Sequence, residues 1–215
     1  YIYIMNTSLQ LYTSRKILLN YLKSDGYDTE AYDEFSTTEV QAMYESQGKD
    51  NVSALDYEVN HTETPEKSCY VFHYTKPSTI KQNTLESIAM DYYEDHDKKN
   101  CTLIIVMQGN INETIQKTVK NMWKKFQEYV IVFEMRSLMF NLFEHSYVPK
   151  HIKLNETEKE KFKRDKNISN ESQIPEISIF DPMAKALFMR PGNVCKIIRY
   201  NKISLENEFF RICVI

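Results

Sequence analysis

Glycine is scarce in this sequence, with four in 215 residues. Loops that cradle nucleotide phosphates need closely spaced glycines, in patterns such as G-x-G-x-x-G or the Walker-type run. Neither pattern occurs. The enzyme classes that hold a nucleotide in such a loop are therefore excluded.

Cysteine is equally rare, and its four positions lie far apart. No two are closer than 18 residues, so a C-x-x-C zinc knuckle cannot form. Three lie in apolar runs, where a free cysteine behaves as a small hydrophobic residue. This usage favours a reducing compartment over a disulfide scaffold. The four are Cys69, Cys101, Cys195 and Cys213.

Long apolar runs are missing as well. A membrane-spanning helix needs about 20 mostly apolar residues in a row, and no run approaches that length. The apolar segment Tyr1–Ile4 is too short for a signal peptide, and Met5 is the expected natural start. We therefore expect no membrane partner.

Charge is divided unevenly along the chain. Residues 1–140 carry 14 Lys and Arg against 20 Asp and Glu, whereas residues 141–215 carry 13 against 10. Neutralisation of phosphates supplies most non-specific affinity for DNA, so the acidic first part is a poor DNA binder by itself. With the change of pattern near residue 140, we predict two domains, residues 5–140 and 141–215.

The first domain alternates between helical and strand patterns. Strands are predicted at Cys69–Tyr74, Cys101–Met107 and Tyr129–Met135, and the second is apolar enough to be covered on both faces. Residues 46–67 are polar and acidic, as in a loop. The order of strands and helices predicts an α/β domain with a mixed sheet.

Four helices are expected in this domain. The first covers residues 9–23, and the second follows the capping box of Ser36 and Glu39. A third starts at Lys76-Pro77-Ser78, and Asn112 caps the fourth. The fourth helix should bury one apolar stripe: Ile115, Val119, Met122, Trp123 and Phe126.

The second domain is smaller and reads as α+β. Asn155 caps a charged helix that runs to about Lys166, and Asp181-Pro182 opens a short helix to Phe188. Pro191-Gly192 fits the centre of a type II turn. Two strands are predicted, Val194–Arg199 and Phe209–Ile215, joined by a polar loop.

Five landmarks of the second domain resemble the C-terminal domain of RNA polymerase subunit 5, a domain that forms the whole of the archaeal counterpart. Val148-Pro149-Lys150-His151 matches its V-P-K-H signature, and His145 holds the position of an earlier His. Order and spacing also match over about 70 residues. The other landmarks are Gln173-Ile174-Pro175, Asp181-Pro182, the Gly192–Arg199 segment and Arg211.

The first domain is similar to the same family more loosely. Leu22–Tyr27 and Ile105–Gly109 resemble the end of its first helix and one of its strands. The chain thus looks like the two-domain form found in eukaryotes. Its richness in Asn, Lys, Ile and Tyr resembles a homologue from a large cytoplasmic DNA virus, of the African swine fever virus type.

The resemblance implies a non-catalytic subunit of a multisubunit DNA-directed RNA polymerase, in which the two largest subunits make the RNA. It implies a jaw domain similar in fold to restriction endonucleases, followed by an assembly domain that docks on the largest subunit beside subunit 6. No cofactor and no small-molecule substrate are expected. The implied docking residues are His145, Val148, Pro149, Lys150, His151, Asp181, Pro182, Gly192, Lys196, Arg199 and Arg211.

The resemblance also implies a location for the protein. A viral member would work in the viral factory of the host cytoplasm and enter the virion. A cellular member would work in the nucleus.

A basic stripe on the helix after Asn112 is the candidate DNA contact. Lys117, Lys120 and Lys124 share one face, with Lys125 at its side. The plain interpretation is a solvated amphipathic helix. The sharper hypothesis is contact with the phosphates of downstream duplex DNA, aided by the helix N-terminus at Asn112.

Catalytic and metal sites are not expected in this chain. A nuclease of this fold needs paired carboxylates and a Lys, and Cys69–Tyr74 has no carboxylate. The candidates Asp95-His96-Asp97 and the pair His145 and His151 are better interpreted as structural, because neither supplies a convergent ligand set. Two other functions stay open: a stand-alone, degenerate nuclease-like DNA-binding protein, and a generic adaptor.

Overall fold

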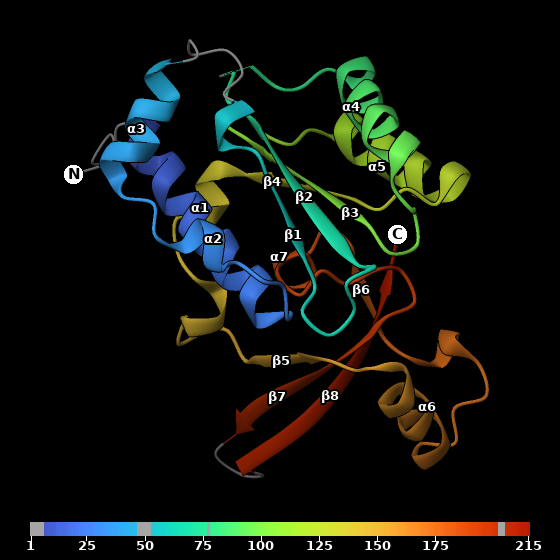
Figure 1. The fold of residues 1–215 in the computed structure, drawn as a ribbon. Coiled ribbons are helices and arrows are strands. Elements are labelled where there is room, and N and C mark those ends of the chain that lie inside the picture. Colours follow the sequence, from blue (N-terminus) through green and yellow to red (C-terminus); the bar gives the residue numbers. More distant parts are fainter. Residues whose placement is uncertain (1–6, 47–52, 77, 202–204) are drawn as a thin grey trace. The chain divides into compact units, whose positions relative to one another are not determined.

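The structure is a computed structural model that describes residues 7–46, 53–76, 78–201 and 205–215. The chain divides into two compact units, unit 1 up to Phe140 and unit 2 from Asn141 onward. Each unit contains a four-stranded sheet with helices beside it (Figure 1). The predicted mixture of helices and strands in both parts of the chain is confirmed.

Unit 1 is built on a mixed sheet with the strand order β1-β2-β3-β4. The first two strands pair antiparallel, and the other neighbours pair parallel. All six residues of β3 are buried, as a strand covered on both faces requires. The strands are β1 (Tyr57–Asn60), β2 (Ser68–Tyr74), β3 (Thr102–Met107) and β4 (Val130–Glu134).

Helices cover both faces of this sheet. Figure 1 shows α1, α2 and α3 on one face and α4 and α5 on the other. The sheet is therefore the middle layer of three, and its apolar strands form the core. The helices are α1 (Thr7–Ser24), α2 (Glu30–Asp33), α3 (Thr37–Ser46), α4 (Gln82–Asp95) and α5 (Glu113–Phe126).

Two predicted helix caps are confirmed in unit 1. The backbone N–H of Ser36 donates to Glu39 Oε2 at 2.7 Å, and Glu39 N–H donates back to Ser36 Oγ at 3.3 Å. At the start of α5, Ile115 N–H donates to Asn112 Oδ1 at 2.9 Å. Each cap satisfies a donor that has no partner inside its helix, so the local sequence fixes these two helix starts.

Other predictions in unit 1 were wrong in detail. The segment predicted as a loop over residues 46–67 contains a short 3₁₀ helix, η1 (Ser53–Leu55), and then β1; residues 47–52 lie outside the described part. Alternating burial along β1, with Tyr57 and Val59 inside, explains the strand. The third helix starts only at Gln82, and Pro77, at its predicted start, lies outside the described residues.

The ends of α5 and β4 also differ from the prediction. Phe126 was expected to point inward, but it is 55% exposed. It is the last residue of α5, and the Lys98 ammonium lies 5.7 Å from its ring centroid. The strand predicted to reach Met135 ends at Glu134, where the 3₁₀ helix η2 (Met135–Leu138) begins.

Unit 2 has the strand order β5-β7-β8-β6. Strand β7 pairs antiparallel with both neighbours, and β6 pairs parallel with β8. The strands are β5 (Lys150–Lys153), β6 (Glu176–Ser178), β7 (Val194–Asn201) and β8 (Leu205–Val214). The remaining elements are η3 (Leu142–Glu144), α6 (Glu156–Asp165), η4 (Glu171–Gln173) and α7 (Pro182–Ala186).

The hairpin of β7 and β8 is longer than predicted. The segment expected to be a polar loop continues the ladder as far as the pair Asn201↔Leu205. This end of the hairpin extends beyond the core and carries polar residues such as Glu206 and Glu208. The alternation of apolar and polar residues that predicts a strand is therefore missing. The short strands β5 and β6 were not predicted either.

The sheet of unit 2 carries an apolar cluster on each face. Cys195, Ile197 and Cys213 pack with residues of α7 on one face. Val194 and Ile212 pack on the other face, with Phe162 of α6 against them. All four cysteines of the chain are buried free thiols. Burial raises the pKa of Cys195 to about 11 and that of Cys213 to about 12.

Among the described residues, no helix combines the length and the apolar character needed to cross a bilayer.

Gly109 follows β3 at a point where two backbone segments approach closely. A Cβ there would lie 3.1 Å from the backbone atoms of Ser78 and Thr79. We expect Gly109→Ala to lower the free energy of unfolding by about 1–3 kcal/mol, because backbone must move to admit the methyl group. Urea titration measures this. The surface control Lys67→Ala should change the value by less than about 0.5 kcal/mol, and equal effects of the two variants would contradict the close packing.

Candidate functional site

The V-P-K-H segment of unit 2 leads from a tight turn into β5. Val148 N–H donates to the carbonyl of His145 at 2.9 Å and closes the turn. Lys150 and His151 then pair with Ile198 and Ile197 of β7. The edge position of β5 thus places this segment alongside the hairpin.

His151 is half-buried, and its own backbone fixes its ring. Nδ1 lies 2.6 Å from the carbonyl oxygen of Pro149, which can only accept, so Nδ1 carries the proton. Burial lowers the pKa of His151, and the hydrogen bond to Pro149 opposes this shift. The neutral ring therefore presents Nε2 as a hydrogen-bond acceptor at neutral pH.

The structure brings several predicted docking residues together around His151. The charges of Asp181, Arg199 and Arg211 all act on its pKa, the first raising it and the other two lowering it. Strand pairing also places Phe209 on the same face of the sheet as His151, because residues opposite each other in a ladder share a face. His151 pairs with Ile197, which pairs with Phe209. We call His151, Asp181, Arg199, Phe209 and Arg211 the docking face.

Each charged member of the docking face is held by a defined contact. The Arg199 guanidinium lies 5.1 Å from the centroid of the Phe209 ring. Arg211 Nη1 donates to the carbonyl of Glu176 at 2.7 Å, which ties β8 to β6. Asp181 accepts from Met183 N–H at 2.8 Å and caps α7, with Pro182 at the first helical position. Contacts within unit 2 thus position each of these three side chains.

Other predicted docking residues lie elsewhere in unit 2. Lys150 and Lys196 occupy the opposite face of the sheet, since they alternate with His151 and Ile197 along their strands. Lys196 Nζ pairs with Glu208 at 2.7 Å, and this hydrogen bond raises the pKa of Lys196. Its main contact is thus an ion pair across the hairpin.

Gly192 has a structural role at the start of β7. Its φ of +93° is the left-handed value that the second central position of a type II turn requires, and Asn193 N–H closes the turn on Arg190 at 2.9 Å. The predicted turn is confirmed. The carbonyl of Gly192 accepts a hydrogen bond from Lys159 Nζ at 2.8 Å.

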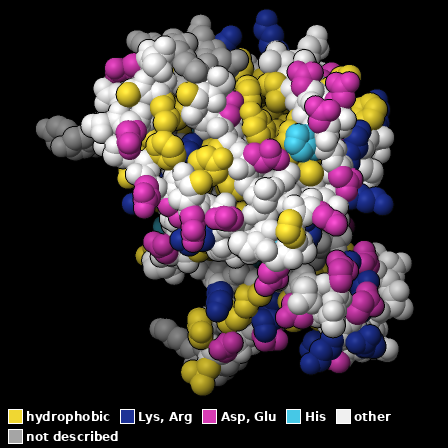
Figure 2. Space-filling model, viewed as in Figure 1, with side chains coloured by type: hydrophobic (Ala, Val, Ile, Leu, Met, Phe, Trp, Pro, Cys, Tyr) yellow, Lys and Arg dark blue, Asp and Glu magenta, His cyan; other side chains and the backbone are white. Residues whose placement is uncertain are grey.

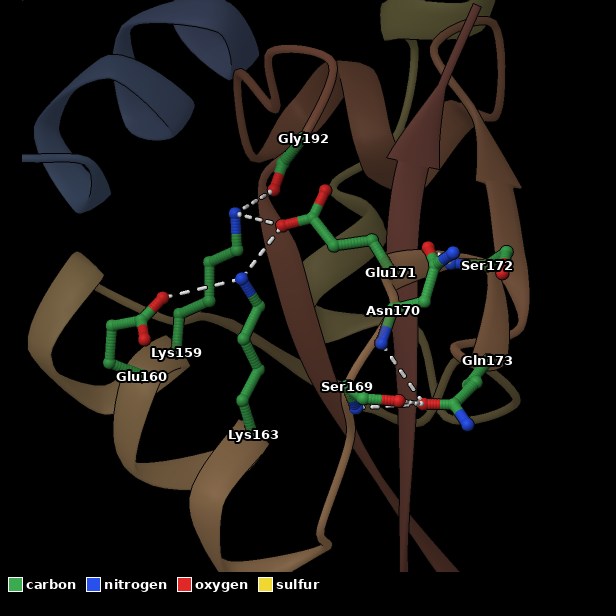
Figure 3. Close-up of polar contacts among 9 residues, drawn as sticks. All are labelled: Lys159, Glu160, Lys163, Ser169, Asn170, Glu171, Ser172, Gln173 and Gly192. Carbon is green, nitrogen blue, oxygen red and sulfur yellow. Dashed lines mark hydrogen bonds and ion pairs between the residues drawn. The ribbon is translucent and has the colours of Figure 1, made fainter.

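Figure 3 shows the polar clamp that holds this turn. Lys159, on α6, also pairs with Glu171 at 3.0 Å, and Lys163 pairs with the same carboxylate oxygen at 2.9 Å. The hydrogen bond from Lys163, then that from Lys159, lowers the pKa of Glu171. The clamp joins α6, η4 and the Gly192 turn, and sequence patterns gave no sign of it.

An open groove of about 600 Å³ runs beside the V-P-K-H segment. Two aromatic side chains on its lining are largely exposed, Tyr147 at 91% and Tyr200 at 80%. Leu205 and Phe209 of β8 are exposed as well. The sequence placed Tyr200, Leu205 and Phe209 in a loop or at a strand end, and did not predict that they form an exposed surface. The lining residues are Ser146, Tyr147, Val148, Pro149, Lys150, Ile198, Arg199 and Tyr200.

The candidate DNA-facing lysines of α5 lie on a solvated side of unit 1. Lys117, Lys124 and Lys125 are exposed, and Lys120 is half-buried. Lys117 Nζ lies 3.5 Å from Glu113 Oε2, so an acidic residue interrupts the stripe at its first turn. The Asn112 side chain is engaged as the helix cap.

Within the described ranges, no three His, Cys, Asp or Glu side chains are grouped as metal ligands. Asp97 supports its own loop, accepting from Asn100 Nδ2 at 2.8 Å. His96 Nδ1 lies 2.7 Å from the carbonyl of Tyr92, and its Nε2 lies 3.5 Å from Glu58. Both residues thus have structural contacts that explain them.

Comparison with known proteins identifies the family. The model of the family described as "RNA polymerase Rpb5, C-terminal domain" matches residues 140–213. Subunit rpabc1 of DNA-directed RNA polymerases I, II and III from Dictyostelium discoideum is 31% identical over 153 residues, 70% of this chain and 74% of that protein. The chain belongs to the RNA polymerase subunit 5 family.

Similarity to the subunit 5 family extends over both units. DNA-directed RNA polymerases IV and V subunit 5B from Arabidopsis thaliana is 29% identical over 206 residues, 94% of this chain and 88% of that protein. The RPABC1 subunit of Caenorhabditis elegans is 27% identical over 210 residues, with 95% and 96% covered. The family resemblance of the motifs is thereby confirmed, and it includes unit 1.

The polar clamp of this subunit 5 relative should contribute stability that depends on pH. We expect Glu171→Gln to lower the free energy of unfolding at pH 7 by at most about 1 kcal/mol, because the 44% exposed carboxylate is screened by solvent. The folded state lowers the pKa of Glu171, so its stabilisation is present above the unfolded pKa of about 4.3 and lost as pH falls below it.

Urea titrations at neutral and acid pH measure this difference. The wild-type and Glu171→Gln curves should converge at acid pH. Glu160→Gln is the matched control, since among the described residues Glu160 has a single ion pair, 3.3 Å from Lys163, and is 55% exposed. A larger loss from Glu160→Gln, or a gap between wild type and Glu171→Gln that persists in acid, would contradict the clamp.

Proposed function

We propose that this chain is a non-catalytic subunit of a multisubunit DNA-directed RNA polymerase, with RNA synthesis carried by the two largest subunits. The named relatives are polymerase subunits, and this chain covers most of the length of each. Membership of the subunit 5 family over both units is the observation that carries the proposal.

Unit 2 is the part that docks, on the largest subunit and beside subunit 6. Three features support this. The docking face combines two arginines with a histidine, an aspartate and an aromatic ring. The adjoining groove carries exposed aromatics, and Arg and aromatic residues are enriched at protein interfaces. Exposed apolar residues such as Tyr200 and Leu205 also cost solubility unless a partner covers them.

Unit 1 acts as a jaw of restriction-endonuclease-like fold that guides downstream duplex DNA without reading its sequence. Its mixed sheet between two layers of helices is compatible with that fold. The exposed lysines of α5 would meet phosphates. The acidic balance of residues 1–140 fits a contact that depends on the assembled enzyme rather than on the jaw alone.

A viral origin is part of the proposal, and the Asn-, Lys-, Ile- and Tyr-rich composition supports it. The protein would then work in the host cytoplasm at the viral factory and enter the virion, whereas a cellular member would be nuclear. Imaging of the tagged chain in the cells that naturally produce it separates the two, and a purely nuclear signal would overturn the viral assignment.

Co-purification tests the docking. We expect the tagged full chain to bring down the largest polymerase subunit, and Val148→Asp with Tyr200→Asp to reduce its yield by about tenfold or more. A charge placed in a desolvated interface costs several kcal/mol, and every 1.4 kcal/mol is tenfold in affinity. Lys161→Asp, on the exposed side of α6, is the matched control and should leave the yield unchanged.

The outcome also separates the other functions. Absence of any polymerase subunit from the wild-type preparation would contradict the proposal. Tight, salt-dependent binding of the isolated chain to DNA in that case would support the stand-alone DNA-binding protein instead.

Charge reversal on α5 tests the jaw. We expect Lys117→Glu, Lys120→Glu, Lys124→Glu and Lys125→Glu together to abolish crosslinking of unit 1 to downstream DNA in the assembled enzyme. Each lost phosphate contact should reduce the salt slope of DNA binding by about 1. Lys67→Glu with Lys81→Glu, also exposed in unit 1, is the control. Unchanged crosslinking in the α5 variant would contradict the DNA contact.

A further inference from the structure

Unit 1 contains a buried arginine that makes no ion pair with a carboxylate among the residues that the structure describes. Arg15 lies on α1 and is 6% exposed. Its Nη1 donates to the carbonyl of Leu55 at 2.8 Å. Its Nε is buried and finds no hydrogen-bond acceptor among the described residues, where Arg15 also forms no ion pair. Buried arginines are ordinarily paired, because an uncompensated buried charge is costly.

Three aromatic rings lie around this guanidinium. Its Cζ lies 4.4 Å from the ring centroid of Tyr57, 5.0 Å from that of Phe35 and 5.7 Å from that of Tyr32. Such contacts favour a cation but leave its in-plane N–H donors unsatisfied. The three rings, which we call the aromatic cage, therefore hold the Arg15 guanidinium in place but do not accept hydrogen bonds from all of its N–H groups.

The acid whose charge acts on Arg15, Asp56, has its hydrogen bond elsewhere. The charge of Asp56 opposes the lowering of the Arg15 pKa that burial causes. However, Asp56 Oδ1 already accepts from His73 N–H at 2.7 Å, and His73 Nδ1 lies 3.4 Å away. Asp56 thus accepts a hydrogen bond from His73 on β2, and its effect on Arg15 is electrostatic.

A pocket of about 170 Å³ opens onto Arg15. Its walls are aromatic and its rim is polar and exposed. The volume suits a small group, since one water accounts for about 30 Å³ of liquid. The lining residues are Tyr12, Arg15, Lys16, Leu19, Asn20, Tyr32, Asp33 and Phe35.

We propose that the Arg15 pocket receives a single carboxylate presented by another protein. A planar guanidinium fork matches the geometry of a carboxylate. Aromatic walls suit the methylene groups that carry an acidic side chain, and Lys16 and Asn20 at the rim add a charge and hydrogen-bonding groups. This site lies in unit 1 and is independent of the docking face and of the polymerase assignment.

The surroundings disfavour a polyanion such as the nucleic-acid backbone. Asp33 lies at the rim, held by Lys23 at 3.5 Å and by Thr29 Oγ1 at 3.1 Å. Figure 2 shows acidic side chains gathered over α2. A row of phosphates would meet this repulsion along its length, whereas one carboxylate needs to pass the rim at one point to reach the buried cation.

Arginine side-chain NMR of the ¹⁵N-labelled full chain tests the proposal, with sodium acetate as the probe against sodium chloride at equal ionic strength. We expect acetate to shift the Arg15 Nε–H resonance saturably. Lys16→Glu leaves the aromatic cage intact and should weaken binding about five- to tenfold, because it reverses one rim charge. Lys67→Glu, the same change outside the pocket, should leave binding unchanged.

Two further probes identify whether the carboxylate comes from a side chain or from a chain terminus. Saturable shifts with N-acetyl-glutamate amide indicate a side-chain carboxylate, and shifts with N-acetyl-alanine alone indicate a chain terminus; either supports the proposal. It is overturned if acetate gives no shift or a non-saturating one, if Lys16→Glu binds acetate like wild type, or if inorganic phosphate binds as tightly as acetate.

Discussion

The antiparallel ladder between β7 and β8 is the constraint on which unit 2 depends. Eight register pairs run from Val194↔Ile212 to Asn201↔Leu205. Both remaining strands attach to this hairpin, β5 to β7 and β6 to β8. An apolar cluster rests on each of its faces. Because a shift of one residue would turn every side chain to the other face, the register of this ladder decides which groups meet.

The same ladder links the fold to the proposed docking. It places Arg199, Phe209 and Arg211 on one face with His151, while α7 is seated there by Cys195 and Ile197. At the core end the polar clamp holds the Gly192 turn where β7 begins. At the other end the hairpin continues past both apolar clusters, which leaves Tyr200 and Leu205 in solvent. The apolar clusters and the polar clamp thus lie at one end of the hairpin, and exposed apolar side chains lie at the other.

Local signals allowed much of the fold to be predicted from the sequence. Caps at Ser36, Asn112 and Asp181 mark helix starts because they act through neighbouring backbone. The continuous apolar run of β3 gave a buried strand. Edge strands β1, β5 and β6 were missed, since strands of three or four residues carry little pattern. Four members of the docking face were predicted only as parts of separate motifs, and Phe209 was not predicted. Its assembly, like the Arg15 cage and the Glu171 clamp, depends on contacts between residues distant in sequence.

The central claim is that the hairpin surface of unit 2 is covered by the polymerase. Hydrogen exchange of the full chain, free and assembled with the largest subunit, measures this directly. The account predicts slower exchange in the segments around Tyr147, Tyr200 and Phe209, with α6 unchanged. Equal exchange at the hairpin in the two states, with any new protection confined to α6 or to unit 1, would contradict it.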